Sequence, residues 1–500
     1  METARISIHP DFVVAPVNRR TFGSFVEHMG RCVYTGIYEP GHPAADEDGF
    51  RRDVLDLVRE LGVTVVRYPG GNFVSGYRWE DGVGPVGERP TRLDPAWRSV
   101  ESNAFGLGEF LRWAHQAQVE PMMAVNLGTR GLQEAIDLLE YCNHPGGTAT
   151  SDLRRRHGAE EPYGVRMWCL GNEMDGPWQL GHKPAAEYGR IAAETARAMR
   201  QFDADLTLVA CGSSYRHMPT FGAWEATVLE QAYDAVDYIS AHAYYENLGD
   251  PASFLASSVD MDNFITDVVA TADHVRGKLK RTKRIWISFD EWNVWYLSRV
   301  PQQVAGNWEQ VRRVSEEAYT VTDAVVVGSL LITLLRHSDR VKSACLAQLI
   351  NTISVIRSEP GGPSWRQTTF HPFALTARHA KGNVLEVALQ CPTYETEQYG
   401  TVSLVDATAT HDPATGEVSI FVVNRSQAEP VSLEVDLRAL PVPTIADALV
   451  LSDSDVSATN TQDNPNRVRP RPLATQADGS VLRLELPAVS WSCVRLFGRS

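Results

Sequence analysis

Residues 165–175 read VRMWCLGNEMD and residues 285–293 read IWISFDEWN. Each stretch contains a short apolar run with the composition of a buried β-strand, and each run stops at polar residues that include a glutamate. These glutamates are Glu173 and Glu291. If both strands belong to one parallel barrel, their carboxyl ends meet at the same mouth, and the two carboxyl groups can converge on one pocket.

Similar apolar runs recur between about residues 20 and 375 and alternate with helical patterns, which is typical of βα units around a parallel sheet. In the helix predicted over 50–61, apolar residues recur at helical spacing, and Gly62 can supply a left-handed C-terminal cap. Further helices are predicted over 132–141, 185–202 and 261–279. The eight predicted strands are 22–26, 63–68, 122–126, 165–170, 206–211, 238–242, 285–289 and 345–349.

Eight such units over roughly 350 residues favour an α/β fold, the (β/α)8 TIM barrel, and the nearly all-apolar strands suit a sheet buried on both faces. An open doubly wound sheet is the alternative, but no GxGxxG or Walker-type loop follows the first strands. After about residue 375 the sequence alternates with period two, which predicts a C-terminal antiparallel, jelly-roll-like β-sandwich. We expect residues 1–17 to form strands that join the sandwich, 18–375 to form the barrel and 376–500 to form the sandwich.

The composition excludes several classes of protein. The 500 residues carry a formal net charge of −15 with a pI near 5.4, whereas nucleic-acid binding needs clustered Lys and Arg. No window approaches 18 uninterrupted apolar residues, and the N-terminus lacks the apolar core of a signal peptide, so we expect no membrane span and a cytoplasmic protein. The seven cysteines are scattered without CxxC spacing, which indicates reduced thiols rather than disulfides or a metal site.

Two glutamates at strand ends are typical of a glycoside hydrolase. Such an enzyme breaks the acetal of a glycosidic bond with one carboxyl group as the acid and the other as the nucleophile or base. A gap of about 5 to 5.5 Å between the carboxyl groups makes one of them a nucleophile and retains the anomeric configuration, and a gap above about 6.5 Å leaves room for water and inversion. The sequence leaves this choice open. Arg67, at the end of the second predicted strand, is a candidate to keep the nucleophile ionised, because a nearby cation favours a carboxylate.

Other polar and aromatic residues gather at the same predicted edge, which is the mixture that a sugar site needs. Asp290 competes with Glu291 for the pocket, because adjacent strand residues face opposite ways. Each candidate also has a structural explanation, such as packing for the tryptophans or an ion pair of Glu27 with Arg31. The candidates are Glu27, Arg67, Asn72, Asn126, Asn172, Glu173, His242, Tyr244, Glu291, Trp295 and Gln348, with Trp97 in a loop.

At these residues the chain resembles the family 51 glycoside hydrolases, the α-L-arabinofuranosidases. The stretches that carry the resemblance are 25–31, 67–77, 126–130, 168–183 and 288–296. The resemblance covers the predicted barrel from about residue 6 to 375, and the predicted sandwich more loosely.

The resemblance implies a retaining enzyme in which Glu173 is the acid/base and Glu291, rather than Asp290, is the nucleophile. It implies an enzyme of the EC 3.2.1.55 type that needs no cofactor and is often a hexamer. It further implies sugar-binding roles for Glu27, Asn72, Asn172, Tyr244 and Gln348, a pocket lined by Trp97 and Trp295, and support of the nucleophile by Arg67, beside which we place His242.

We therefore expect an exo-acting enzyme that releases terminal non-reducing α-L-arabinofuranosyl residues from oligosaccharides of arabinan or arabinoxylan by double displacement. The alternatives are another retaining barrel glycosidase, such as a β-xylosidase or an endoglucanase, and a non-catalytic sugar-binding protein. A Schiff-base aldolase needs a lysine at a strand end, and Lys183, Lys283 and Lys342 lie in a loop or ahead of strands. The linkage and the natural leaving group stay open.

Overall fold

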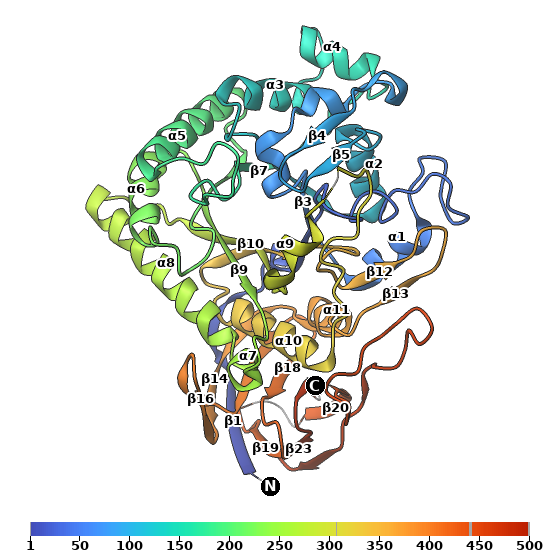
Figure 1. Ribbon diagram of the computed structural model, residues 1–500. Helices are drawn as coiled ribbons and strands as arrows, with labels where there is room; N and C mark the ends of the chain where they lie inside the picture. Colours follow the sequence, from blue (N-terminus) through green and yellow to red (C-terminus); the bar gives the residue numbers. More distant parts are fainter. Residues whose placement is uncertain (1, 307, 440–442, 499–500) are drawn as a thin grey trace.

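The computed structural model describes residues 2–306, 308–439 and 443–498. A barrel surrounded by helices lies against a large β-sheet, and both chain ends lie at the sheet (Figure 1). The barrel is closed, all of its strand pairs are parallel, and the strands follow one another in sequence order. They are β2 (Gly23–Phe25), β3 (Val65–Tyr68), β6 (Glu120–Ala124), β7 (Met167–Leu170), β8 (Thr207–Ala210), β9 (Tyr238–Tyr245), β10 (Trp286–Val294) and β11 (Val341–Ala347). The predicted TIM barrel is confirmed.

Helices cover the outside of the barrel, and the four predicted helices are among them. The first ends as its sequence predicts: Gly62 has a φ of 80°, and its N–H bonds to the carbonyls of Val58 and Arg59. The helices are α1 (Arg52–Leu61), α2 (Leu107–Ala117), α3 (Leu132–Asn143), α4 (Ala149–Arg156), α5 (Ala185–Phe202), α6 (Ala223–Ala232), α7 (Pro251–Leu255), α8 (Ser258–Leu279), α9 (Val300–Gln303), α10 (Val321–Arg336) and α11 (Phe370–His379).

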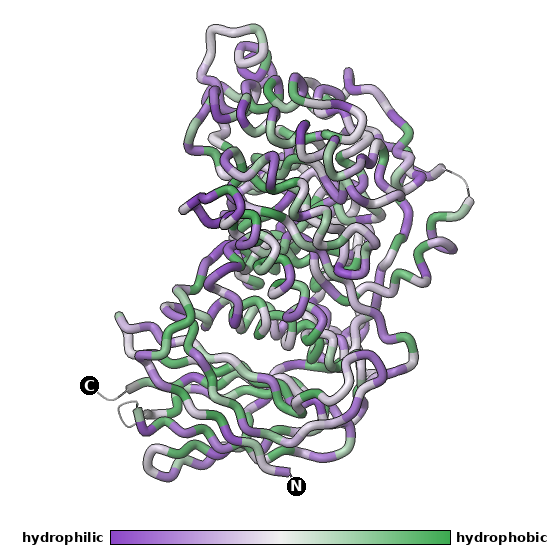
Figure 2. Tube along the Cα trace, turned by 90° about the vertical axis from the view of Figure 1, so that its left-hand side faces the viewer, coloured by the Kyte–Doolittle hydropathy of each residue, from purple (hydrophilic) through white to green (hydrophobic). Residues whose placement is uncertain are grey.

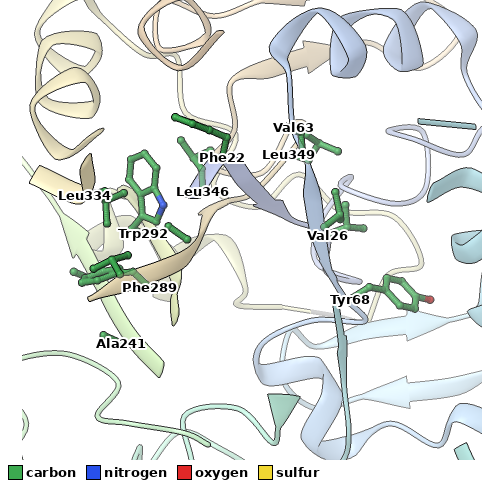
Figure 3. Packing of buried hydrophobic residues seen from close by; sticks show 14 of the residues in the cluster. Phe22, Val26, Val63, Tyr68, Ala241, Phe289, Trp292, Leu334, Leu346 and Leu349 are labelled. Carbon is green, nitrogen blue, oxygen red and sulfur yellow. The ribbon is translucent and has the colours of Figure 1, made fainter. Parts of the chain in front are cut away.

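Helix α10 is buried on nearly all sides because it lies between the barrel and the sheet, where it contacts β10 and β11 as well as the C-terminal strands. It begins with a capping box in which the Thr320 hydroxyl accepts from the Asp323 N–H. Phe289 and Trp292 point from β10 into the same apolar cluster as Leu334 of α10 (Figure 3). Among the described residues, no helix has the length and apolar character needed to cross a bilayer.

The C-terminal part is one mostly antiparallel sheet of ten strands, which lies below the barrel in both views (Figures 1 and 2). The first strand of the chain belongs to it and forms its one parallel pair, with β19. Alternate side chains of these strands, such as Ile6, Ile420 and Leu433, enclose a separate apolar core. In spatial order the strands are β21 (Arg471–Pro472), β20 (Pro443–Leu451), β24 (Ser490–Gly498), β18 (Glu417–Asn424), β17 (Val405–Asp412), β14 (Asn383–Gln390), β1 (Glu2–Pro16), β19 (Val431–Asp436), β23 (Val481–Leu486) and β22 (Thr475–Asp478).

The domain limits at residues 17 and 375 stay a prediction. Three two-stranded ribbons decorate the two parts: β4 (Arg92–Asp94) with β5 (Ser99–Glu101), β12 (Ile356–Ser358) with β13 (Ser364–Arg366), and β15 (Thr393–Thr396) with β16 (Gly400–Ser403). The seven cysteines carry free thiols, and six of them are buried.

Candidate active site

A cavity of about 640 Å³ opens at the carboxyl ends of the barrel strands. Eight of the predicted site residues line it, and they come from loops or strand ends that are far apart in the sequence. Part of the lining is apolar and includes Leu297, Val300 and Val304. The predicted residues on the lining are Glu27, Asn72, Trp97, Glu173, Tyr244, Glu291, Trp295 and Gln348.

Glu173 lies just past β7 in a tight turn. Its φ of 44° is in the left-handed region that non-glycine residues seldom adopt, and the preceding Gly171 has a φ of 95°. The Trp178 N–H donates to Glu173 Oε2 at 2.7 Å, and His242 Nδ1 lies 2.9 Å from Oε1. Burial raises the pKa of Glu173, and the charge of Glu291 raises it further against these hydrogen bonds. This carboxyl group is therefore disposed to keep its proton.

Glu291 faces Glu173 across the cavity. One carboxylate oxygen of each lies within 4.8 Å of the other. Arg67 Nη1 donates to Glu291 Oε1 at 2.6 Å, and the Tyr244 hydroxyl donates to Oε2 at 2.8 Å. The guanidinium on one oxygen and the hydroxyl donor on the other hold this buried carboxyl group in one orientation.

The position of Glu291 corrects two expectations. It lies inside β10 rather than after the strand, because β10 runs on to Val294. Asp290 and Glu291 were also expected to face opposite ways, yet both side chains reach His242. The register between β10 and β9 shifts between Ser288 and Glu291, and that irregularity breaks the alternation.

Three predicted residues lie behind the lining rather than on it. Arg67 links the two segments that carry the glutamates, because its Nη1 bonds to Glu291 and its Nη2 donates to Asn172 Oδ1 at 2.6 Å. His242 Nε2 lies 3.0 Å from Asp290 Oδ1. Although burial alone would lower the pKa of His242, the charge of Glu291 and the hydrogen bonds with Asp290 and Glu173 raise it to about 10. Burial opposes ionisation of Asp290, but Arg67 and His242 lower its pKa.

Glu27 is a buried carboxyl group on the cavity lining. Its Oε1 accepts from the Trp97 indole at 3.0 Å and from the Phe73 N–H at 2.9 Å, and Gln348 Nε2 lies 3.3 Å from Oε2. Burial raises the pKa of Glu27 to about 8. The ion pair with Arg31 does not form, because Arg31 bonds instead to Glu316 at 2.6 Å.

Gly70 and Gly71 do more than form a turn. A Cβ on Gly70 would lie 2.5 Å from Glu27 Cγ, and a Cβ on Gly71 would lie 3.1 Å from Glu291 Oε1. Both glycines therefore leave space for carboxyl side chains of the cavity.

A group of donor atoms at this centre has the spacing of metal ligands, since atoms of Glu173, His242 and Glu291 lie within 4.8 Å of one another. A histidine ligand needs a free ring nitrogen, and both nitrogens of His242 are bonded to carboxylates. A protonated imidazole therefore fits these contacts better than a neutral imidazole that binds a metal ion.

One named candidate lies elsewhere, and several lining residues were missed. Asn126 bonds to the backbone of its own loop and of Tyr77. Trp178 was missed although it follows Glu173 by only five residues. Tyr215, Leu297, Val300 and Val304 were also missed. The last three lie in or next to two very short helices, Leu297–Arg299 and α9, which are too short to show a clear periodicity.

Comparison with known proteins identifies the family. The family model for the α-L-arabinofuranosidase 1 domain matches residues 57–263, and the model for the α-L-arabinofuranosidase C-terminal domain matches residues 290–490. The chain is 58% identical over 504 residues to the intracellular exo-α-(1→5)-L-arabinofuranosidase of Streptomyces lividans. The matched region covers 99% of this chain and 75% of that protein.

It is 54% identical over 510 residues to the exo-α-(1→6)-L-arabinofuranosidase of Bifidobacterium longum, with 99% of this chain and 98% of that protein covered. Among solved structures, a family 51 α-L-arabinofuranosidase of Bifidobacterium longum superposes with a TM-score of 0.95 at 49% identity over 99% of both chains. The chain belongs to the α-L-arabinofuranosidases of glycoside hydrolase family 51.

Proposed function

We propose that this chain is a retaining, exo-acting α-L-arabinofuranosidase that releases terminal arabinofuranosyl residues from arabinan- or arabinoxylan-derived oligosaccharides. The observation that carries the proposal is the approach of Glu173 and Glu291, whose nearest oxygens lie within 4.8 Å. This spacing fits a double displacement, in which no water molecule has to stand between the second carboxylate and the sugar.

In the first step Glu173 gives its proton to the glycosidic oxygen while Glu291 attacks the anomeric carbon. The C–O bond to the leaving group breaks, and an ester bond to Glu291 forms. Arg67 and Tyr244 each bond to one oxygen of Glu291 and so fix its orientation, which supports its role as nucleophile.

In the second step Glu173 acts as the base. The negative charge of Glu291 disappears when the ester forms, so one cause of the raised pKa of Glu173 disappears with it. Glu173 can then take a proton from an incoming water molecule, which cleaves the ester and releases arabinose with its original configuration.

An exo action needs a cavity that is closed on the side of the terminal sugar. We propose that Glu27, Trp97 and Gln348, which are buried and bonded through Glu27, form this closing wall. We assign the ring-binding role to this wall together with Asn72, Asn172 and Trp295. The word intracellular in the name of the Streptomyces lividans relative supports our proposal of a cytoplasmic enzyme. We further propose a homohexamer, which light scattering can test as a mass six times the 55.4 kDa chain.

The test is turnover of 4-nitrophenyl α-L-arabinofuranoside against the matching β-xyloside, with the first-formed anomer followed by NMR. We expect strong preference for the arabinofuranoside, retention, and losses of several orders of magnitude in Glu173→Ala and Glu291→Ala. Added azide should restore turnover of both variants. The arabinosyl azide formed by Glu173→Ala should keep the anomeric configuration of the substrate, and the azide formed by Glu291→Ala should have the inverted configuration. An inverted product from the unaltered enzyme, or near-normal turnover by either variant, contradicts the proposal.

A further inference from the structure

We propose that His242 is a permanently protonated counter-ion shared by the two catalytic carboxyl groups, that Asp290 keeps it so, and that this pair sets the pH range in which Glu173 works. The inference rests on the proposed function and deepens it. It assigns His242 to the acid/base as well as to the nucleophile, and it gives Asp290 a role as a positioning residue.

The distances place His242 between the two glutamates. Its Nδ1 lies 2.9 Å from Glu173 Oε1 and 3.6 Å from Glu291 Oε2, and its Nε2 lies 3.0 Å from Asp290 Oδ1. A neutral imidazole has one donor and one acceptor nitrogen, whereas an imidazolium donates from both, from Nε2 to Asp290 and from Nδ1 toward whichever of Glu173 and Glu291 carries the negative charge. The ring is buried, so no water competes for these contacts.

Asp290 is itself fixed as an anion. It is buried, its Oδ2 lies 3.9 Å from Arg67 Nε, and its pKa is lowered by Arg67 and His242 in spite of burial. The irregularity in β10 that turns Asp290 and Glu291 to the same side is what places this anion behind the imidazole. Sequence alternation would have directed it out of the barrel.

The charges around the ring are consistent with a held proton. Asp175, from the loop after β7, also acts on His242, and its side chain bonds to Ser214. The nearby thiols of Cys169 and Cys211 are neutral, because burial raises the pKa of each. The charged groups that act on His242 are Glu173 and Asp175 after β7 and Asp290 and Glu291 in β10. The groups that act in turn on these carboxyl groups are Arg67 in β3, Cys169 in β7, Cys211 after β8 and Tyr244 in β9.

The charge balance explains why a fixed cation is useful. Before the first step Glu291 is negative and Glu173 is neutral. Afterwards Glu291 is a neutral ester, Glu173 is negative because its proton has left on the alcohol, and the net charge of the pocket is unchanged. An imidazolium in contact with both groups faces one negative carboxylate in each state, so it stabilises both without moving or giving up its proton.

The test compares His242→Gln with the unaltered enzyme in the pH dependence of kcat/KM. Glutamine has no charge, and loss of a cation raises the pKa of the facing acid. We expect the alkaline limb, which reports deprotonation of Glu173, to move up by about one pH unit. Because Glu173 is then a weaker acid, kcat/KM should fall more for substrates with alkyl or oligosaccharide leaving groups than for the 2,4-dinitrophenyl substrate, and the two losses should differ by about tenfold or more.

His28→Gln is the matched control. His28 is also a buried barrel histidine bonded to a carboxylate, with Nδ1 2.8 Å from Glu101 Oε2, but it does not touch the catalytic pair. The alkaline limb of the kcat/KM profile of His28→Gln should stay where it is in the unaltered enzyme. If the limb of His242→Gln also stays in place while the rate falls, the role is merely structural and the inference is overturned.

A second measurement does not depend on the fold of the Gln variant. In protein labelled with ¹⁵N-histidine, the ring nitrogens of His242 should give imidazolium shifts at pH 8, and Asp290→Asn should convert them to neutral shifts at that pH. Neutral shifts in the unaltered enzyme overturn the inference. Failure of the proposed function is a different result, in which the unaltered enzyme does not cleave the arabinofuranoside or Glu173→Ala stays active.

Discussion

The guanidinium of Arg67 donates to Glu291 Oε1 at 2.6 Å although 224 residues separate the two in the sequence. The same side chain donates to Asn172 beside Glu173, and it lies over the Phe25 ring with its Cζ 4.9 Å from the ring centroid. One arginine thus ties three barrel strands or strand ends to the nucleophile. A planar fork can do this, whereas a point charge cannot.

Arg67→Lys is expected to keep the charge and lose the fork. Lysine can reach only one of the two acceptors, so Glu291 or Asn172 loses its anchor, and kcat/KM should fall about a hundredfold. Steady-state kinetics on the aryl arabinofuranoside measures the fall, and a melting curve checks that the barrel is intact. Activity within threefold of normal would show that charge alone suffices.

Glu27→Gln is expected to be mild at neutral pH. The pKa of about 8 means that Glu27 is mostly uncharged at pH 7, so an uncharged amide resembles the working form. We expect kcat/KM within about tenfold of normal for Gln and a further tenfold loss for Ala, which removes the contacts with Trp97 and Phe73.

The same substitution should alter the pH dependence of stability. The pKa of Glu27 is raised in the folded chain above its unfolded value of about 4.3, so its stabilising effect is present below pH 4.3 and is lost as the pH rises through 8. Glutamine does not ionise, so the Glu27→Gln variant does not lose stability at this position as the pH rises. The Tm of Glu27→Gln relative to the unaltered protein should therefore be higher at pH 8 than at pH 5, and the opposite trend would count against a neutral Glu27.

Gly71→Ala is expected to displace the nucleophile. Its Cβ would lie 3.1 Å from Glu291 Oε1 and 3.4 Å from Asn172 Nδ2, so one of these side chains has to shift from its Arg67 contact. We expect kcat to fall about ten- to a hundredfold with a smaller change in KM. Gly87→Ala is the control, because no atom lies within 4 Å of the new Cβ, and it should leave kcat unchanged.

Asp406→Ala is expected to destabilise the protein without affecting catalysis. Asp406, in β17, bonds to Arg336 of α10 and accepts from Arg425 at 2.7 Å, so it joins the barrel to the sheet. Removing it leaves buried Arg425 without this carboxylate, at a cost of about 3–5 kcal/mol. Denaturant unfolding measures this, and exposed Asp56→Ala, which loses an ion pair to Arg59, should cost less than about 1 kcal/mol.

The contribution of Asp406 should also disappear in acid. Burial opposes its ionisation, but Arg336 and Arg425 lower its pKa below the unfolded value of about 3.9. Its stabilisation is therefore present above pH 3.9 and is lost as the pH falls through the folded pKa. The difference in stability between Asp406→Ala and the unaltered protein should shrink in that range, and a constant difference would contradict the assignment.

Much of the fold could be predicted because its signals are local. The eight strands are short apolar runs, and Gly62 ends α1 because only a residue without Cβ adopts its φ of 80° without strain. The position of Glu173 after its strand follows from the same runs, whereas Gln348 falls inside the predicted strand 345–349 and lies just past β11, which ends at Ala347. Strand ends were less predictable: β9 and β10 run three and five residues past the predicted limits, so Tyr244 and Glu291 lie within strands.

The sequence by itself determined that a parallel barrel places its strand-end glutamates at one mouth, because the strand periodicity and the βα order leave few other arrangements. Only the tertiary structure decided which atoms meet there. The direction of Asp290 depends on a shift in register between β10 and β9, and the proton on His242 depends on charges from two other segments. Register shifts and buried electrostatics arise between segments far apart in the chain, so no local pattern encodes them.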